Sequence, residues 1–278
     1  MLNQETKALL KEKAAYIRLD IIEQVFRASS GHPGGSLSSA DILSYLYFKE
    51  MHVDPENPTD PDRDRFVLSK GHASPLLYGA LAEKGFFPKE DLKSFRQTTS
   101  YLQGHPDKKG TPGVDMTTGS LGIGISAACG MALAGKISGK SYRVYALCGD
   151  GEMEEGQVWE AAMFAHHYEL DNLTVFVDFN GLQIDGKITD VIDPTPIDKK
   201  FEAFGWNVIC INGNDLDEID DAVSSAKKCK GKPTAIIAAT TKGKGVSFME
   251  NQAGWHGKAP NKEQYEQAVS EIVAAMAK

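Results

Sequence analysis

Hydrophobic residues in this chain recur with two different periods, and the two periods alternate along the sequence. Five short apolar runs have the length and composition of buried strands. They cover residues 65–68, 142–148, 173–179, 206–211 and 234–240. Helical spacing is found at residues 5–28, 39–48, 74–85, 122–137, 158–165, 195–205, 215–228 and from 261 onward. This alternation predicts an α/β fold, a single doubly wound domain over residues 1–278 with about five parallel strands and helices on both faces.

Two glycine-rich segments interrupt the pattern. Residues 29–35, SSGHPGG, are expected to form a loop, since their glycines and proline disfavour a helix. Residues 103–120, QGHPDKKGTPGVDMTTGS, form a second, longer polar segment. A loop of that length inside a compact domain is usually functional or disordered. Both segments carry a histidine beside a glycine.

Residues 142–186 predict a β-α-β unit with polar residues at the ends of both strands. The first strand stops at the GDG of residues 149–151, and the second stops at Asn180-Gly181. Such a crossover joins parallel strands, so Asp150 and Asn180 should lie at the edge where open α/β sheets bind ligands. A carboxylate and an amide oxygen suit Mg2+, and the glycines let the backbone approach a bulky charged group. The simplest interpretation is a site for a diphosphate and its magnesium.

Composition narrows the class of protein. The 278 residues are 41% hydrophobic and 24% charged, with a net charge of −8, which disfavours a nucleic-acid binder with a basic stripe. A local basic pocket can still bind phosphorylated substrates. Neither a membrane span nor a signal peptide is expected from the apolar runs. The four cysteines lack CxxC spacing and lie mostly in apolar runs, so we expect reduced, buried thiols and a cytoplasmic protein.

Four of the seven histidines lie beside a glycine in a loop. They are His32, His72, His105 and His256. One such histidine is more often a turn residue than a functional one, but four in the same setting favour a shared site. Histidines can donate to phosphate or sugar oxygens and move protons near neutral pH. A zinc site is the competing interpretation, which the absence of i, i+4 histidine pairs and of nearby cysteines disfavours. The other three histidines are interpreted as structural or surface residues.

The glycine-rich turn at residues 119–124, GSLGIG, has two interpretations. Together with Ala127 it contains G-x-G-x-x-A, which resembles a dinucleotide fingerprint. The context does not fit, because no strand precedes it and no acidic residue follows about twenty positions later. The turn therefore either cradles a different cofactor with its backbone or simply begins a helix that needs small side chains.

Charged residues in the loops also have two interpretations. Glu152 and Glu154 are interpreted as favouring a helix N-terminus through its dipole. Four lysines in glycine-bearing loops could balance phosphate charge, although any one of them alone is more typically solvated. They are Lys70, Lys242, Lys244 and Lys258.

Taken together, the motifs resemble the amino-terminal half of transketolase, a thiamine diphosphate enzyme. SGHPGGS, SKGHASP, QGHP, TTGSLG, GDGEMEEGQVWEA, NGLQIDG and TKGKG…WHGKAP occur in the family's order over nearly the whole chain. In that family this half is the pyrophosphate-binding domain. The resemblance implies thiamine diphosphate and Mg2+, or another divalent cation such as Ca2+, as cofactors. It also implies transfer of a two-carbon ketol unit from a ketose phosphate to an aldose phosphate.

The resemblance further implies roles for individual residues. Metal ligands would be the side chains of Asp150 and Asn180 and the backbone carbonyl of Leu182. Catalytic residues lining the substrate channel would be His32, His72, His105 and His256. Cofactor-binding positions would be His72, Gly119, Ser120, Leu121, Gly149, Asp150, Gly151, Glu155, Asn180, Lys242 and His256. Glu155 also matches an acidic position at the interface between paired subunits. Two positions depart from the pattern, since Ile123 replaces a common glutamine and Gly181 replaces a second asparagine.

A transketolase chain normally continues into a pyrimidine-binding domain, which carries the glutamate that acts on the cofactor's aminopyrimidine, and into a third domain. We expect this chain to lack both, so the resemblance implies a split transketolase. A C-terminal subunit would supply the pyrimidine-binding domain, in an α2β2 heterotetramer that binds sugar phosphates. The alternatives are an α-type subunit of another thiamine diphosphate enzyme, a non-catalytic transketolase-like binding protein and an NAD-dependent oxidoreductase. SGHPGG and KGHASP favour sugar-phosphate chemistry over the first alternative.

Overall fold

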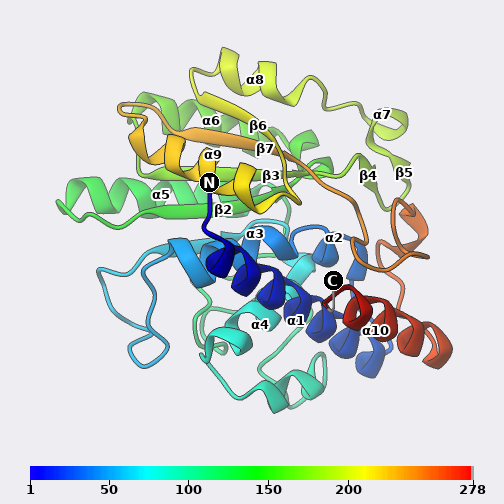
Figure 1. Ribbon diagram of the computed structural model, residues 1–278. Helices are drawn as coiled ribbons and strands as arrows, with labels where there is room; N and C mark the ends of the chain where they lie inside the picture. Colours follow the sequence, from blue (N-terminus) through cyan, green and yellow to red (C-terminus); the bar gives the residue numbers. More distant parts are fainter. Residues whose placement is uncertain (277–278) are drawn as a thin grey trace.

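A computed structural model describes residues 1–276 and shows a five-stranded sheet covered by helices on both faces (Figure 1). The strand order is β1-β2-β3-β7-β6, and every pairing within the sheet is parallel. The strands are β1 (Arg65–Leu68), β2 (Val144–Gly149), β3 (Leu173–Phe179), β6 (Asn207–Asn212) and β7 (Thr234–Ala239). The predicted fold class is confirmed, and the central strand β3 lies between β2 and β7.

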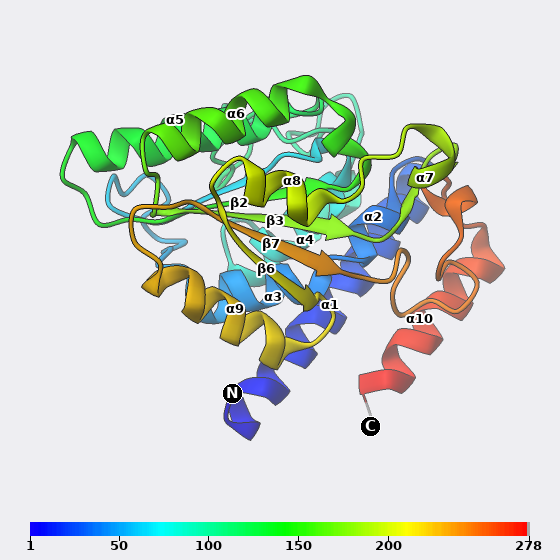
Figure 2. The ribbon, with the colours of Figure 1, turned by 90° about the horizontal axis from the view of Figure 1, so that it is seen from above.

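Two groups of helices enclose the sheet, as Figure 2 shows from above. One face carries α5 (Ile123–Ile137), α6 (Gly156–His167) and α8 (Ile197–Ala203). The other carries α1 (Gln4–Ala28), α3 (Ala40–Tyr45), α4 (Ser74–Lys84) and α9 (Leu216–Lys228). The outer helix α10 (Lys262–Met276) packs on α1. Shorter elements are α2 (Pro33–Leu37), α7 (Ile188–Val191) and the antiparallel pair β4 (Leu182–Gln183) and β5 (Gly186–Lys187). The π-helical segment η1 (Leu46–Glu50) follows α3, and the short 3-10 helices are η2 (Gly71–Ala73), η3 (Lys89–Ser94), η4 (Gly151–Glu154) and η5 (Ala253–Trp255).

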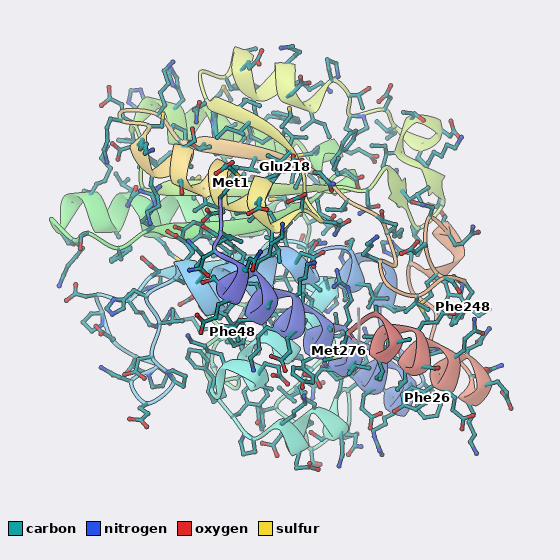
Figure 3. All side chains as sticks on the ribbon, viewed as in Figure 1. Met1, Phe26, Phe48, Glu218, Phe248 and Met276 are labelled. Carbon is teal, nitrogen blue, oxygen red and sulfur yellow. The ribbon has the colours of Figure 1, made fainter. Side chains whose placement is uncertain are left out.

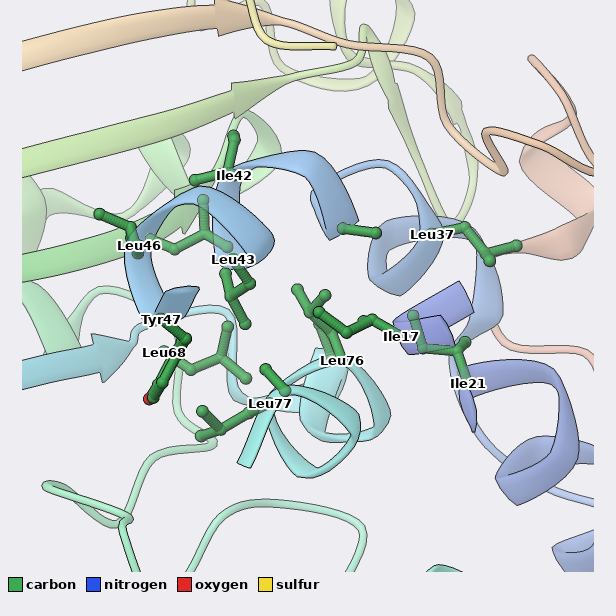
Figure 4. Close-up of a cluster of buried hydrophobic side chains, with 14 of the residues drawn as sticks. Ile17, Ile21, Leu37, Ile42, Leu43, Leu46, Tyr47, Leu68, Leu76 and Leu77 are labelled. Carbon is green, nitrogen blue, oxygen red and sulfur yellow. The ribbon is translucent and has the colours of Figure 1, made fainter. Parts of the chain in front are cut away.

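A large apolar core joins α1, α3 and α4 beneath the sheet (Figure 4). Ile17 and Ile21 of α1 are fully buried there, and so are Leu43 of α3 and Leu76 of α4. Burial of each such side chain stabilises the fold by roughly 1.5–3 kcal/mol. A second core lies between the sheet and α5, α6 and α8. The strands are therefore apolar on both faces, which explains their continuous hydrophobic runs.

Helices α1 and α10 pack side by side. Asn3 caps α1, because its side chain accepts a hydrogen bond from the backbone N–H of Thr6 at 2.8 Å. Phe26, labelled in Figure 3, lies near the other end of α1. Its ring stacks on Tyr265 of α10 with the ring centroids 4.2 Å apart. No helix within residues 1–276 is both long and apolar enough to cross a membrane.

Some local predictions were wrong. Residues 29–35 were expected to be a loop, but Pro33–Leu37 forms the short helix α2. Proline is accepted there because it occupies the first helical turn, where its missing N–H has no partner to lose. Cys129 and Cys148 are buried as predicted, whereas Cys210 is exposed and Cys229 is partly exposed. The pair β4–β5 and helix α7 were not predicted, since segments of two to four residues carry too little periodicity.

Candidate active site

The carboxyl ends of β2 and β3 bring Asp150 and Asn180 to the same edge of the sheet. The strands pair in parallel from Val144–Leu173 to Gly149–Asp178, so the residues that follow them emerge together. Asp150 is buried, and its two carboxylate oxygens accept hydrogen bonds from the backbone N–H groups of Gly151 at 2.8 Å and Gly181 at 2.5 Å. Gly181 has a φ of 75°, a left-handed conformation that favours glycine. Gly181, which departs from the family pattern, therefore serves the turn that orients Asp150.

Burial and nearby charges shift the pKa values of side chains at this edge of the sheet. We call the positions of Asp150, Asn180 and Leu182 the metal corner. Burial raises the pKa of Asp150 to about 6, and the neighbouring Asp178 adds to the rise, while the N–H groups of Gly181 and Gly151 oppose it. Lys242 is only 1% exposed, and burial lowers its pKa to about 8 against the influence of Asp150 and Asp178. A further cation would stabilise the charged form of Asp150, since an opposite charge nearby lowers the pKa of a carboxyl.

The predicted metal ligands fit a hard cation. Asp150 offers a carboxylate, Asn180 an amide oxygen and Leu182 a backbone carbonyl, which accepts a hydrogen bond from Lys242 Nζ at 2.9 Å. Mg2+ and Ca2+ prefer oxygen donors of these kinds. Within residues 1–276 no group of three or more His, Cys, Asp or Glu side chains is arranged to hold a metal.

Three of the four predicted histidines form a compact cluster. The ring centroids of His32 and His72 are 5.1 Å apart, those of His72 and His256 are 5.1 Å apart, and those of His32 and His256 are 5.5 Å apart. His105 lies against the glycine turn instead, because a Cβ placed on Gly119 would be 3.3 Å from His105 Cδ2. Loops from four distant parts of the sequence thus converge on one site.

All four histidines are biased towards the neutral form. Burial lowers the pKa of His32 to about 4, helped by the positive charge of Arg96. Burial lowers the pKa of His256 to about 3, helped by Lys242. The pKa of His72 is also well below its usual value because of burial, and that of His105 is lowered by burial and then by Arg96. At neutral pH these imidazoles are therefore uncharged, and each has one ring nitrogen that can accept and one N–H that can donate a hydrogen bond.

Lys242 connects the metal corner to the histidine cluster. Its Nζ lies 2.9 Å from the carbonyl oxygen of Leu182 and 3.0 Å from Nδ1 of His256. The neutral ring of His256 can accept from the ammonium group, which fixes the position of the proton on the other ring nitrogen. One buried lysine therefore contacts both the Leu182 carbonyl and the histidine cluster.

The remaining predicted positions lie around these groups. Gly71 packs so closely on the 118–119 turn that a Cβ there would be 2.7 Å from Thr118 Oγ1 and 2.8 Å from the Gly119 nitrogen. This close approach places the His72 loop beside Gly119. The rim of the site contains exposed Ser120, half-buried Leu121, and exposed Glu155 at the start of α6. Gly149 ends β2, and Gly151 begins η4.

Three buried charged residues were missed or misinterpreted from the sequence. Glu152, interpreted as a helix-dipole residue, is buried and accepts from Ser69 Oγ at 2.5 Å, Gly122 N at 2.9 Å and Gly149 N at 3.0 Å. Lys70, interpreted on its own as solvated, forms a buried ion pair with Asp178. The available signal was Asp178 itself, a carboxylate inside the apolar run of β3, because charged residues are rarely buried unless paired. Of the other loop lysines, Lys242 is buried too.

Comparison with known proteins identifies the family to which the chain belongs. The family described as "Transketolase, thiamine diphosphate binding domain" matches residues 10–273. The chain belongs to this transketolase family. The resemblance found in the sequence motifs is therefore confirmed, and the thiamine diphosphate-binding domain of transketolase covers nearly all of the chain.

Transketolase relatives of two sizes are similar to this chain. It is 47% identical over 263 residues to the 6-deoxy-6-sulfo-D-fructose transketolase subunit SqwG of Clostridium sp. (strain MSTE9), covering 95% of this chain and 96% of the relative. It is 43% identical over 266 residues to an apulose-4-phosphate transketolase subunit of Actinobacillus succinogenes, covering 95% of each. Human transketolase is 44% identical over 97% of this chain, which amounts to 43% of the human protein. The crystal structure of Campylobacter jejuni transketolase superimposes with a TM-score of 0.89 at 37% identity, covering 98% of this chain and 43% of that one.

Proposed function

We propose that this chain is the N-terminal subunit of a two-chain transketolase, with residues 1–278 as its pyrophosphate-binding domain. The enzyme would transfer a two-carbon ketol unit from a ketose phosphate to an aldose phosphate. The observation that carries this proposal is the position of Lys242. Its ammonium group contacts both the Leu182 carbonyl at the metal corner and the ring of His256 in the histidine cluster. Contact of one lysine with both groups, in a chain of the transketolase family, supports the proposal that the two groups belong to one site.

Thiamine diphosphate and Mg2+, or another divalent cation such as Ca2+, are the proposed cofactors. Asp150, Asn180 and the carbonyl of Leu182 would hold the metal, because they supply only oxygen donors. The backbone at residues 119–121 and 149–151 would face the cofactor, and Lys242 would balance its negative charge. The remaining proposed cofactor-binding residues are His72, Glu155 and His256.

Bound thiamine diphosphate supplies the chemistry that breaks and remakes a carbon–carbon bond, while the protein binds and orients the reactants. The four histidines are the proposed catalytic residues. Their lowered pKa values keep them neutral at pH 7, so each ring has one nitrogen that can accept a hydrogen bond from a sugar hydroxyl and one N–H that can donate to a sugar oxygen. His256 and His105 are proposed to contact the reacting carbonyl and hydroxyl groups.

A partner subunit carrying a pyrimidine-binding domain is part of the proposal, in an α2β2 heterotetramer. Two relatives that match the chain over 95% of both sequences or more are named as transketolase subunits. Exposed Glu155, at the edge of the site, is the residue proposed to face a paired subunit. We also propose the cytoplasm as the location, since all four cysteines are free thiols, the usual state in a reducing compartment.

A sulfonated ketose is a second candidate donor. The relative that is 47% identical over nearly its whole length is named for 6-deoxy-6-sulfo-D-fructose, and a sulfonate resembles a phosphate in shape and negative charge. A competition assay that contains both a ketose phosphate and 6-deoxy-6-sulfo-D-fructose distinguishes the two candidate donors.

The test is reconstitution. The purified chain, a candidate partner subunit and the two together are each assayed with thiamine diphosphate and Mg2+, using an aldose phosphate acceptor and either a ketose phosphate or 6-deoxy-6-sulfo-D-fructose as donor. We expect turnover only when both chains are present, and calorimetric binding of the cofactor to the complex. Robust turnover by the chain alone would refute the two-chain assembly, and a complex that binds no thiamine diphosphate would refute the function.

A further inference from the structure

The Lys70–Asp178 ion pair lies beneath the site and has no assigned part in the proposed function. Lys70 Nζ lies 2.6 Å from Asp178 Oδ2, and the two side chains are 2% and 0% exposed. A buried ion pair loses its hydration. The attraction between its charges offsets that loss only where the geometry is good and the remaining hydrogen bonds are satisfied. Lys70 meets that condition, since it also donates to the carbonyl of Gly35 at 2.7 Å and to Ser39 Oγ at 2.9 Å.

Asp178 is the centre of this network. Its Oδ2 accepts from Ser38 Oγ at 2.6 Å and from Asn180 Nδ2 at 3.0 Å, in addition to Lys70. Its other oxygen accepts from the hydroxyl of Thr240, just after β7. A carboxylate paired with lysine can only accept hydrogen bonds. Each neighbour of Asp178 must therefore turn a donor towards it.

This requirement determines which way the amide of Asn180 points. The two ends of an asparagine amide are alike in shape but opposite in chemistry, since one is an NH2 donor and the other an oxygen acceptor. Asp178 takes the NH2 end. The oxygen end then faces the opposite side, where it accepts from the backbone N–H of Leu182 at 3.2 Å. In the same turn, Gly181 N–H donates to Asp150.

We propose that Asp178, held by Lys70, is the positioning residue for Asn180: it fixes the amide so that its oxygen, and not its nitrogen, is presented to the cation bound by Asp150. The inference rests on the proposed function, since it concerns the metal ligand of that site. A cation binds only the oxygen end of an amide, so a freely rotating Asn180 would present the wrong end part of the time. Partners that orient metal ligands in this way typically change metal affinity by about 10–100-fold when mutated.

The same pair also links the metal corner to two histidine loops. Lys70 precedes His72 by two residues, and its contacts with Gly35 and Ser39 reach the segment that follows His32. Asn180 and the histidines are thus fixed relative to each other by one buried group. Loss of the pair should therefore affect the orientation of Asn180 most and the loops of His32 and His72 less.

The main test removes the pair without leaving a lone buried charge. In Lys70→Met/Asp178→Leu, apolar side chains replace both partners, so neither charge is left buried alone. Mg2+ affinity is measured by titration calorimetry on the complex of the chain with its partner subunit, in the presence of thiamine diphosphate, and folding is checked by thermal unfolding. We expect Mg2+ to bind about 10–100-fold more weakly. Asp178→Asn, which keeps the side-chain volume, should weaken Mg2+ binding in the same direction.

A rescue experiment separates positioning from a general structural role. A carboxylate has oxygen at both ends and needs no orientation, so Asn180→Asp added to the double variant should restore most of the lost Mg2+ affinity. In the wild-type background the same substitution should weaken binding, because the introduced carboxylate would face the carboxylate of Asp178. A purely structural role for the pair predicts no such reversal.

The matched control removes another buried ion pair, at the amino-terminal end of β1. Arg63→Met/Asp115→Leu eliminates a pair whose side chains are 11% and 4% exposed, and Mg2+ affinity should stay within about threefold of wild type. A folded Lys70→Met/Asp178→Leu complex with unchanged Mg2+ affinity, or the absence of rescue, would overturn the inference while leaving the proposed function intact. A wild-type complex that binds neither Mg2+ nor Ca2+ would overturn both.

Discussion

The two sides of the candidate site differ in how completely their polar groups are hydrogen-bonded. The metal side contains Asp150, Asp178 and Lys70, and the histidine side contains the histidine cluster. On the metal side, the oxygens of Asp150 and Asp178 all accept hydrogen bonds, and Lys70 is fully paired. On the histidine side, the rings of His32 and His72 meet edge to face, and the buried Nδ1 of His32 has no hydrogen-bond partner among residues 1–276. One side is rich in fixed charges, whereas the other is neutral and incompletely bonded.

This difference indicates a division of labour. A fully hydrogen-bonded charged network is rigid and suited to hold a group of fixed geometry, such as a metal with a diphosphate. An imidazole with a free nitrogen is suited to groups that change during a reaction, because it can accept or release a proton. Substitutions on the two sides should therefore have separable effects.

The largest effect is expected from removal of Asp150. Asp150→Ala eliminates the one carboxylate among the proposed metal ligands, so Mg2+ affinity of the complex, measured by calorimetry with thiamine diphosphate, should fall by about 100-fold or more. Glu154→Gln is the control, because this nearby carboxylate contacts Gln183 at 2.8 Å and none of the proposed ligands. Equal Mg2+ affinity in Asp150→Ala and wild type would show that Asp150 is not a ligand of the bound Mg2+.

Substitution of the histidines should separate catalysis from cofactor binding. His105→Ala and His256→Ala are each expected to lower the rate of ketol transfer by about 100-fold, the size of a typical general acid–base contribution. Mg2+ affinity should change by less than about threefold in His105→Ala, since that ring lies beside Gly119 and not at the metal corner. His52→Ala, an exposed histidine, serves as the control. Unchanged transfer rates in both variants would contradict the proposed catalytic role.

The same contrast explains what the sequence could and could not predict. Asp150, Asn180 and the four histidines were predictable, because they follow strand ends or lie beside glycines. Each of these signals is local and depends on only a few neighbouring positions. The alternation of periods likewise predicted all five strands of the sheet to within two residues at each end.

The supporting charges were not predictable in the same way. Lys70 looks like any loop lysine until the fold places it against Asp178, which is 108 residues away in the sequence. Glu152 likewise joins Ser69, Gly122 and Gly149, and only the tertiary structure shows that these donors surround it. Helix α2, which was expected to be a loop, also has a distant partner, since the backbone N–H of Gly243 donates to the carbonyl of Gly34 at 2.9 Å.

A smaller effect, on stability, should follow from Glu152→Gln. Glutamine keeps one oxygen but turns an NH2 group towards a backbone N–H, either that of Gly149 or that of Gly122. One buried donor is then left unsatisfied, which should lower the free energy of unfolding by about 1–3 kcal/mol. Urea denaturation measures this loss, with Glu160→Gln on the exposed surface of α6 as the control. An unchanged free energy of unfolding would show that the hydrogen bonds accepted by the Glu152 carboxylate do not contribute to stability.

The smallest effect concerns the pH dependence contributed by His32. Burial, helped by the positive charge of Arg96, lowers the pKa of His32 to about 4, whereas in the unfolded chain it is about 6.5. Between pH 6.5 and 4 the unfolded chain binds more protons, so the free energy of unfolding should decrease as the pH falls through this window. Allowing for the partial exposure of the ring, the contribution lost by pH 5 should be about 1 kcal/mol.

His32→Asn isolates that contribution, because asparagine does not titrate in this range. Urea denaturation of the chain without Mg2+ at pH 7.5 and pH 5 should show a smaller loss of stability in His32→Asn than in wild type, and no difference for His52→Asn. That result would show that burial keeps His32 neutral, and that this neutrality lowers the free energy of unfolding at acidic pH. If wild type and His32→Asn lose the same stability, the ring of His32 is solvated well enough to protonate normally, and the contrast between a charged and a neutral side is weaker than the geometry implies.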